Sequence, residues 1–213
     1  RQNNLWLCTR NAQYIYRTET KQVVKLKTPI QEEVFYIEQA KGNRYFFGTR
    51  ENVYVAILKG NELVLEPEHT ISDIHRVQHI HYHVPTDRLL IGTMADGFYV
   101  YDPQTKTVYN IGNLKDVTMN DAVTAHSSSE EVLIDTDGNG VYKLNMHTLE
   151  LHSFLSTTQE SGKMNGDIIK DIYLDEEDRV WMTVFPISVT VYSDKYPSYE
   201  WLHQINDDSQ SLV

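Results

Sequence analysis

The chain has 213 residues, of which 40% are hydrophobic and 14 are tyrosine, and its formal net charge is −11. This length suits one or two domains with a sizeable core, and the tyrosine content, together with many Val, Ile and Thr, favours strands over helices. The negative charge argues against nonspecific binding to nucleic acid or anionic lipid, because both need a basic face.

The only cysteine, Cys8, excludes an intramolecular disulfide. It ends the apolar run 5–8, where we expect it to be a small core residue. The sequence begins with Arg1 and shows no signal peptide, and no apolar stretch is long enough to cross a membrane. We therefore expect either a soluble protein or a piece of a longer one.

Five short apolar segments recur along the chain, at residues 5–9, 45–49, 89–93, 132–136 and 180–184. Their starting positions lie 40 to 48 residues apart. The first four segments end in threonine, whereas the fifth has Val184 at this position. A fixed period of this length is the sequence signature of a repeat architecture.

Each apolar segment is part of a set of strand-like runs. The runs that follow are 14–16, 53–55, 98–101, 141–144 and 189–192, and then 23–26, 63–65, 107–109, 150–154 and 199–202. The runs that precede all but the first are 34–37, 77–84, 122–125 and 168–174. Each repeat thus contains four short strands and no helical apolar period. Such units are typical of β-propeller blades, and a sandwich would not explain the near-constant spacing.

We therefore predict an all-β fold, a single propeller region over 1–213 with about five blades of four antiparallel strands. The predicted blades are 1–30 (partial), 31–70, 71–116, 117–160 and 161–205, and 206–213 reads as the lead-in to a further blade. A propeller closes into a ring to hide its strand edges. Two arrangements stay open, a tight ring of five incomplete units or an incomplete arc of a larger, seven-bladed type of propeller, and we favour the arc.

In a propeller, the hairpins between second and third strands share one face with the loops that join successive blades, and that face usually binds ligands. Arg, Asp and Asn side chains can make paired hydrogen bonds to sugar hydroxyls or carboxylates. The alternative is ordinary solvated turn chemistry. The candidate ligand-binding residues of this face are Arg10, Arg50, Asn52, Asp96, Asp137 and Asn139.

Two patterns suggest metal ligands without completing a site. Residues 135–140 resemble the opening of a calcium loop, but Met146 stands where such a loop needs a glutamate, so we expect a structural turn. His79, His81 and His83 alternate along a strand and project from one face, but no nearby Cys, Asp or Glu completes a set. We expect polar positions on a half-exposed strand, and predict no metal and no cofactor.

Two tryptophans and a group of carboxylates could take part in binding or catalysis, but we expect structural roles for them. Trp6 and Trp181 occupy equivalent repeat positions, which indicates packing between blades. The carboxylates of 171–178 gather in one turn and are expected to face solvent. We therefore predict no catalytic residues in this chain.

Residues 172–181 and 90–102 resemble the two halves of a propeller repeat found in periplasmic sensor domains of hybrid two-component proteins from bacteria that digest complex glycans. The resemblance implies a periplasmic ectodomain that binds an oligosaccharide or other small ligand. It implies a signal that crosses the membrane to a histidine kinase, a receiver and a DNA-binding domain, none of which can be read in this sequence. It also allows a homodimer formed through the parent protein, with membrane contact only through that protein's other parts.

The leading hypothesis is therefore a fragment of a ligand-sensing ectodomain. A propeller lyase or glycosidase is the first alternative, and it would need a convergent His/Tyr/Arg or carboxylate set on the loop face. A non-catalytic protein-interaction scaffold is the second, because a fold alone does not choose among these functions.

Overall fold

The computed structural model describes residues 4–72, 74–94, 96–125, 129–155, 164–186 and 188–193, together with the backbone of the strand at 196–203. The expected lead-in at 206–213 lies outside these residues. Within the described part of the chain, no helix has the length and apolar character needed to span a membrane.

The described strands form five antiparallel sheets, each made of strands that are consecutive in the sequence. The first sheet contains β1 (Leu5–Thr9), β2 (Ala12–Arg17) and β3 (Gln22–Lys25), and the second contains β4 (Tyr36–Gln39), β5 (Arg44–Gly48), β6 (Val53–Lys59) and β7 (Glu62–Leu65). The third contains β8 (Val77–His83), β9 (Arg88–Thr93), β10 (Phe98–Asp102) and β11 (Thr107–Ile111). The fourth contains β12 (Met119–Thr124), β13 (Glu131–Thr136), β14 (Val141–Asn145) and β15 (Leu151–Leu155), and the fifth contains β16 (Ile169–Leu174), β17 (Val180–Val184), β18 (Ser188–Ser193) and β19 (Tyr196–His203).

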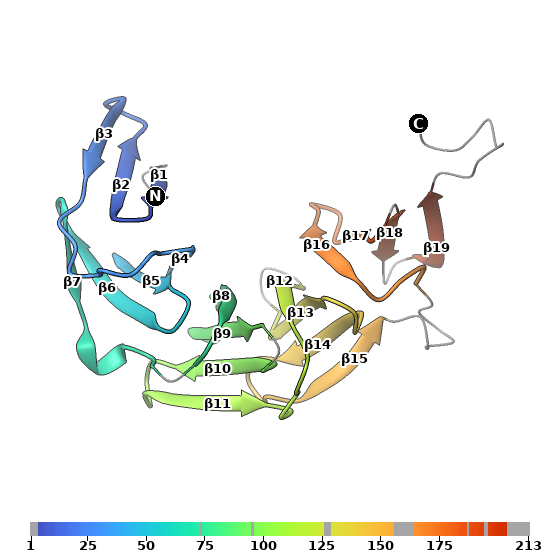
Figure 1. Ribbon diagram of the computed structural model, residues 1–213. Helices are drawn as coiled ribbons and strands as arrows, with labels where there is room; N and C mark the ends of the chain where they lie inside the picture. The colour runs from blue at the N-terminus through green and yellow to red at the C-terminus, as the bar shows by residue number, and fades with distance from the viewer. Residues whose placement is uncertain are drawn as a thin grey trace.

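The five sheets follow one another around an open arc, from the first sheet in blue to the fifth in orange and red (Figure 1). The opening strands β4, β8, β12 and β16 lie along the inner side of the arc, and successive ones contact each other. The sheets fan around an axis and do not stack as two layers, so a sandwich is excluded.

The hydrophobic core is divided into four clusters, each shared by two consecutive sheets. Between the second and third sheets, for example, Phe46 packs in one cluster with Ile80 and Leu89. Between the third and fourth sheets, Phe98 and Met119 belong to the next cluster. Since burying a side chain of this size contributes about 1.5–3 kcal/mol, these clusters bind each sheet to its neighbours.

The recurring threonine closes the hairpin that follows it. The Thr93 hydroxyl donates to the Gly97 carbonyl at 2.9 Å and accepts the Asp96 N–H at 2.9 Å. Thr136 makes the same pair of bonds in its own sheet, and the Thr49 hydroxyl likewise accepts a hairpin N–H, that of Asn52, at 3.0 Å. A hydroxyl that satisfies two turn groups in this way explains why the repeat ends in threonine.

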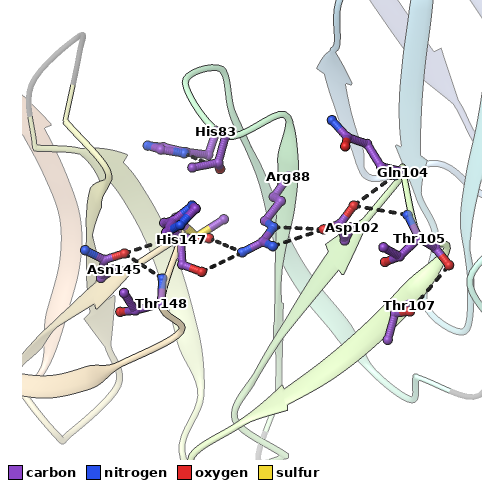
Figure 2. A network of polar contacts seen from close by, with 11 residues as sticks. His83, Arg88, Asp102, Gln104, Thr105, Thr107, Asn145, His147 and Thr148 are labelled. Atoms are coloured by element: carbon purple, nitrogen blue, oxygen red, sulfur yellow. Dashed lines mark hydrogen bonds and ion pairs between the residues drawn. The ribbon is translucent and has the colours of Figure 1, made fainter.

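A polar clasp joins the third and fourth sheets at the opposite end of their strands (Figure 2). The Arg88 guanidinium donates to Asp102 Oδ2 at 3.0 and 3.1 Å, and to the carbonyls of Met146 and His147 at 2.6 and 3.0 Å. The side chains of Arg88 and Asp102 are only 18% and 11% exposed, so this ion pair is largely withdrawn from water. In the adjoining turn, Asn145 Oδ1 accepts backbone N–H groups at 2.8 and 2.9 Å.

Two expectations about the ends of the arc are corrected. Cys8 is exposed and not a core residue, because β1 belongs to the end sheet and no described sheet covers its outer face. Trp6 does pack between sheets, with its ring 4.8 Å from that of Tyr45 and 5.6 Å from that of Phe47. Trp181 instead contacts its own sheet, where its indole N–H donates to Asp175 at 2.8 Å.

A glycine in β9 allows the third and fourth sheets to approach closely. A Cβ at Gly92 would lie 2.5 Å from Met119 Cγ and would also clash with the Cβ and sulfur of Met119. We expect Gly92→Ala to lower the free energy of unfolding by about 2 kcal/mol, because the core would have to shift. Urea unfolding measures this.

The equivalent glycine of the second sheet provides a matched control. A Cβ at Gly48 would meet Tyr36 Cβ at 3.3 Å, which a small adjustment relieves. Gly48→Ala is therefore expected to cost less than Gly92→Ala. Equal costs for the two substitutions would show that the approach of Met119 to Gly92 is not the limiting contact.

Candidate functional site

Hairpins and linking segments meet on one face of the arc, as the repeat pattern predicts. The Arg50 carbonyl of one hairpin accepts the Val77 N–H at 3.0 Å, and the Arg76 carbonyl accepts the Met94 N–H at 2.9 Å. Within the fourth sheet, the Asp137 N–H donates to the Thr118 carbonyl at 3.1 Å. We call this the loop face, comprising the hairpins 49–52, 94–97 and 136–140 and the linking segments 70–76 and 112–118.

A pocket of about 320 Å³ opens on the loop face between the second and third sheets. The Arg50 guanidinium lies over the Phe35 ring, 5.1 Å from its centre. Aromatic and apolar surface therefore lies beside cationic groups, a combination that suits a ligand with a flat apolar side and polar substituents. We call this the arginine pocket; its lining includes Phe35, Tyr36, Arg50, Arg76, Gln78 and Met94.

A larger cavity of about 580 Å³ lies between the first and second sheets. It is lined by Trp6 and Ile15 on one side and by Ile37 and Tyr45 on the other. In the other sheets an opening strand pairs with the strand that corresponds to β1, whereas among the described strands only β2 pairs with β1. The cavity therefore follows from the three-stranded form of the first sheet, and it lacks the convergent cations of the arginine pocket.

A row of polar side chains lies next to the arginine pocket, in the seam between β8 and β12. The His79 ring centre is 5.3 Å from that of Tyr36, and its Nε2 lies 3.0 Å from Asp121 Oδ1. Farther along β8, His81 hydrogen bonds to the Thr124 hydroxyl at 2.9 Å and His83 to the Ser129 carbonyl at 2.8 Å.

This placement corrects the expectation of a half-exposed strand. The three histidines do share one face of β8, but that face is covered by the next sheet, and His83 is fully buried. Within the described residues, no group of three or more potential ligands could hold a metal ion. The histidine row is thus a polar lining between two sheets.

Burial dominates the electrostatics of this seam and of the adjoining strands β4 and β13. It raises the pKa of Glu38 to about 7 and that of Asp135 to about 8, and lowers the pKa of His81 to about 4. Burial also lowers the pKa of His79 and raises that of Asp121, while the attraction between the two opposes both shifts. The seam therefore favours the neutral forms of its acids and imidazoles, because charged forms are poorly solvated there.

Of the residues named from the sequence, the structure places Arg50 in the arginine pocket. The Asn52 side chain is turned to Glu32, to which it donates at 2.9 Å. Thr49 and Tyr54 donate to the same carboxylate, and these bonds outweigh burial and hold the pKa of Glu32 below its usual value. Asn52 thus stabilises the hairpin that presents Arg50.

The other named residues lie elsewhere on the loop face. Arg10 is exposed and 4.0 Å from Glu33, and Asp137 pairs with Lys170 at 2.8 Å. Asp96 and Asn139 are exposed, and their backbone N–H groups donate to the threonines that close their hairpins. Nothing in the structure gathers these four into one site.

The residues at 135–140 that resemble the opening of a calcium loop already have protein partners. Asp137 pairs with Lys170, and buried Asp135 accepts the N–H of Asp121.

The sequence reasoning missed most of the pocket lining. Arg76, Phe35 and Met94 belong to linking segments and hairpin edges, which share the loop face but carry no motif. The one signal for these residues in the sequence was their position in the repeat. Arg76 immediately precedes the opening strand of the third sheet, and linking residues likewise precede the opening strands β4, β12 and β16.

No protein-family model and no curated protein matches this sequence. Solved structures do match. The extracellular domain of the putative hybrid two component system BT3049 from B. thetaiotaomicron aligns with 99% of this chain at a TM-score of 0.70 and 16% identity. The extracellular domain of BT4673 from the same organism aligns with 86% at 0.68 and 18% identity. The β-propeller domain of Myceliophteria thermophila Cps50 (Swd1) aligns with 99% at 0.69 and 12% identity.

The chain folds as a β-propeller. The sequence-based prediction of an all-β propeller with radially arranged blades is confirmed, and the open arc agrees with it. The chain spans 28% and 25% of the two B. thetaiotaomicron domains and 70% of the Cps50 domain. At these identities the likeness shows the propeller fold, and any common activity is a separate question.

Proposed function

We propose that this propeller segment is part of the ligand-sensing, extracytoplasmic domain of a membrane-anchored two-component regulator, and that it binds an oligosaccharide. The observation that carries the proposal is the alignment of 99% of the chain with the extracellular domain of BT3049, described as a putative hybrid two component system. The extracellular domain of BT4673, described as a putative one component system in one structure and as a putative hybrid two component system in another, aligns with 86% and 85% of the chain respectively. In this proposal the kinase and DNA-binding functions belong to the parent protein.

The arginine pocket supports a binding role. Phe35 and Met94 are 42% and 43% exposed, so they offer apolar surface to a ligand. Gln78 and the two arginines supply hydrogen-bond donors around that surface. Sugar rings have an apolar face and a polar edge, which matches this division. A pocket of about 320 Å³ lies at the lower end of the range for small-ligand sites.

One observation favours a second candidate function, a polysaccharide lyase. The structure brings together the His/Tyr/Arg set that the sequence analysis required for such an enzyme, with Tyr36 beside His79 and Arg50 lining the same pocket as Tyr36. The lowered pKa of His79 leaves a neutral imidazole, which can accept a proton. The sensor proposal leads because His79 is held by Asp121, and its side chain is only 20% exposed.

Calorimetric titration with a panel of oligosaccharides tests the proposal. We expect saturable binding with micromolar to millimolar affinity and unchanged oligosaccharide afterwards. Recovery of shortened or unsaturated products, abolished by His79→Ala, would support the lyase. Failure of every oligosaccharide to bind would contradict the sensing proposal and favour a protein-interaction scaffold.

A further inference from the structure

The arginine pocket concentrates positive charge on an acidic protein. The chain has a formal net charge of −11, yet Arg50 and Arg76 line the same small pocket. Among the described residues, no carboxylate lies within ion-pair distance of either guanidinium. The nearest acidic residue in the hairpin, Glu51, is instead paired with His75 at 2.8 Å.

The backbone holds the two arginines together. Val77 donates to the Arg50 carbonyl at 3.0 Å, and this bond fixes the hairpin against the residue that follows Arg76. Arg76 has a left-handed backbone, with φ of 57°, and its carbonyl accepts the Met94 N–H at 2.9 Å. A non-glycine residue keeps this conformation only where its surroundings impose it. The backbone at both arginines is therefore fixed before a ligand arrives, and the two side chains start from neighbouring positions on the same pocket.

Two unpaired cations in one pocket repel each other, and an anion between them removes that repulsion. Guanidinium groups bind carboxylate and sulfate oxygens through paired, charge-assisted hydrogen bonds. The Arg50 guanidinium carbon lies over the Phe35 ring, a contact with the ring face that does not use the N–H donors.

We propose that the arginine pocket selects glycans that carry an anionic substituent, a carboxylate or a sulfate, and that Arg50 and Arg76 together bind it. This inference rests on the proposed sensing function and narrows its ligand class. A sugar ring then lies against Phe35 and Met94, and Gln78 bonds to its hydroxyl groups. A neutral glycan offers the two guanidinium groups only hydroxyl oxygens, and such hydrogen bonds are weaker than those to an anion.

The test compares matched ligands on the same protein. Calorimetry is performed with a galacturonate oligosaccharide and its neutral methyl ester, and with a sulfated disaccharide and its unsulfated form. We expect at least one anionic ligand to bind about tenfold or more tightly than its neutral partner, with an affinity that falls as salt is added. The two ligand pairs separate carboxylate from sulfate as the anion.

Variants assign the effect to the pocket. Arg50→Gln and Arg76→Gln are each expected to weaken binding of the anionic ligand about tenfold or more and to change binding of the neutral ligand much less. Arg10→Gln, an exposed arginine in another hairpin, is the control and is expected to bind as the native chain does. Thermal melting of each variant confirms that it is folded.

The outcomes separate the two proposals. Equal affinity for neutral and anionic glycans, or native affinity in both pocket variants, would overturn the anion inference while leaving the sensing function intact. If no glycan of either kind binds, both proposals fall.

Discussion

Replacing Arg88 with alanine is expected to lower the free energy of unfolding by about 3 kcal/mol, because a largely buried ion pair would lose its cation. Asp102 would keep its charge with only the N–H groups of Gln104 and Thr105 as partners, at 2.9 and 3.3 Å. The carbonyls of Met146 and His147 would lose the donor that joins the third sheet to the fourth (Figure 2). Urea unfolding followed by circular dichroism measures the change.

Two variants show which part of the clasp matters. Arg88→Lys keeps the charge, but its single nitrogen carries three donors and cannot reproduce the four bonds that Arg88 makes from three nitrogens, so we expect an intermediate loss. Arg17→Ala is the control, because that arginine lies in the first sheet and donates to exposed Asn61. Native stability in Arg88→Ala would show that the clasp contributes nothing to the joint between these sheets.

The second large effect concerns Asp135, and it depends on pH. Burial raises the pKa of this carboxyl to about 8, with the charges of Asp121 and Asp171 acting in the same direction, while the unfolded carboxyl titrates near pH 4. Between these pH values the folded chain holds a proton that the unfolded chain has released. This contribution to the free energy of unfolding is therefore fully present below about pH 4 and is lost as pH rises to about 8.

Asparagine at position 135 has no proton to lose. Its amide oxygen can still accept the Asp121 N–H that the carboxylate accepts. We expect Asp135→Asn to match the native chain near pH 4 and to exceed its free energy of unfolding by about 3 kcal/mol at pH 8. Urea unfolding at several pH values measures the difference.

Exposed Asp116 provides the control, since Asp116→Asn makes the same change at a carboxylate that is not among the charges raising the pKa of Asp135. We expect it to keep the native pH profile nearly unchanged. An Asp135→Asn variant whose advantage does not grow between pH 4 and pH 8 would mean that the native carboxyl is ionised throughout this range.

The sequence predicted the architecture because each repeat forms its strands and turns from residues that are close together in the sequence. The apolar segments at 45–49 and 89–93 are β5 and β9 with their closing threonines, and the turns fall where glycine and aspartate allow positive φ, as at Gly97 and Asp87. Two opening strands were displaced. The expected run at 34–37 becomes β4 at Tyr36–Gln39, because Val34 and Phe35 form the approach to the sheet, and the expected run at 122–125 becomes β12 at Met119–Thr124.

The site could be predicted only in part, because it is made between repeats. Arg50 was identified from its hairpin, but its partner Arg76 lies in a linking segment with no recognisable pattern. The contact between His79 and Asp121 joins residues from two sheets. The periodicity within one sheet does not indicate which residues of neighbouring sheets will face each other. Cys8 and Trp181 were misjudged for the related reason that a place in the repeat does not show whether a neighbouring sheet covers it.

The most direct test of this account is a two-dimensional ¹H–¹⁵N NMR titration of the labelled chain with the tightest-binding glycan. We expect chemical-shift changes to centre on Arg50, Arg76 and Gln78, at the loop face between the second and third sheets. Changes centred on the opposite end of the strands, around Arg88 and His147, or scattered over all five sheets, would contradict the assignment of the ligand site.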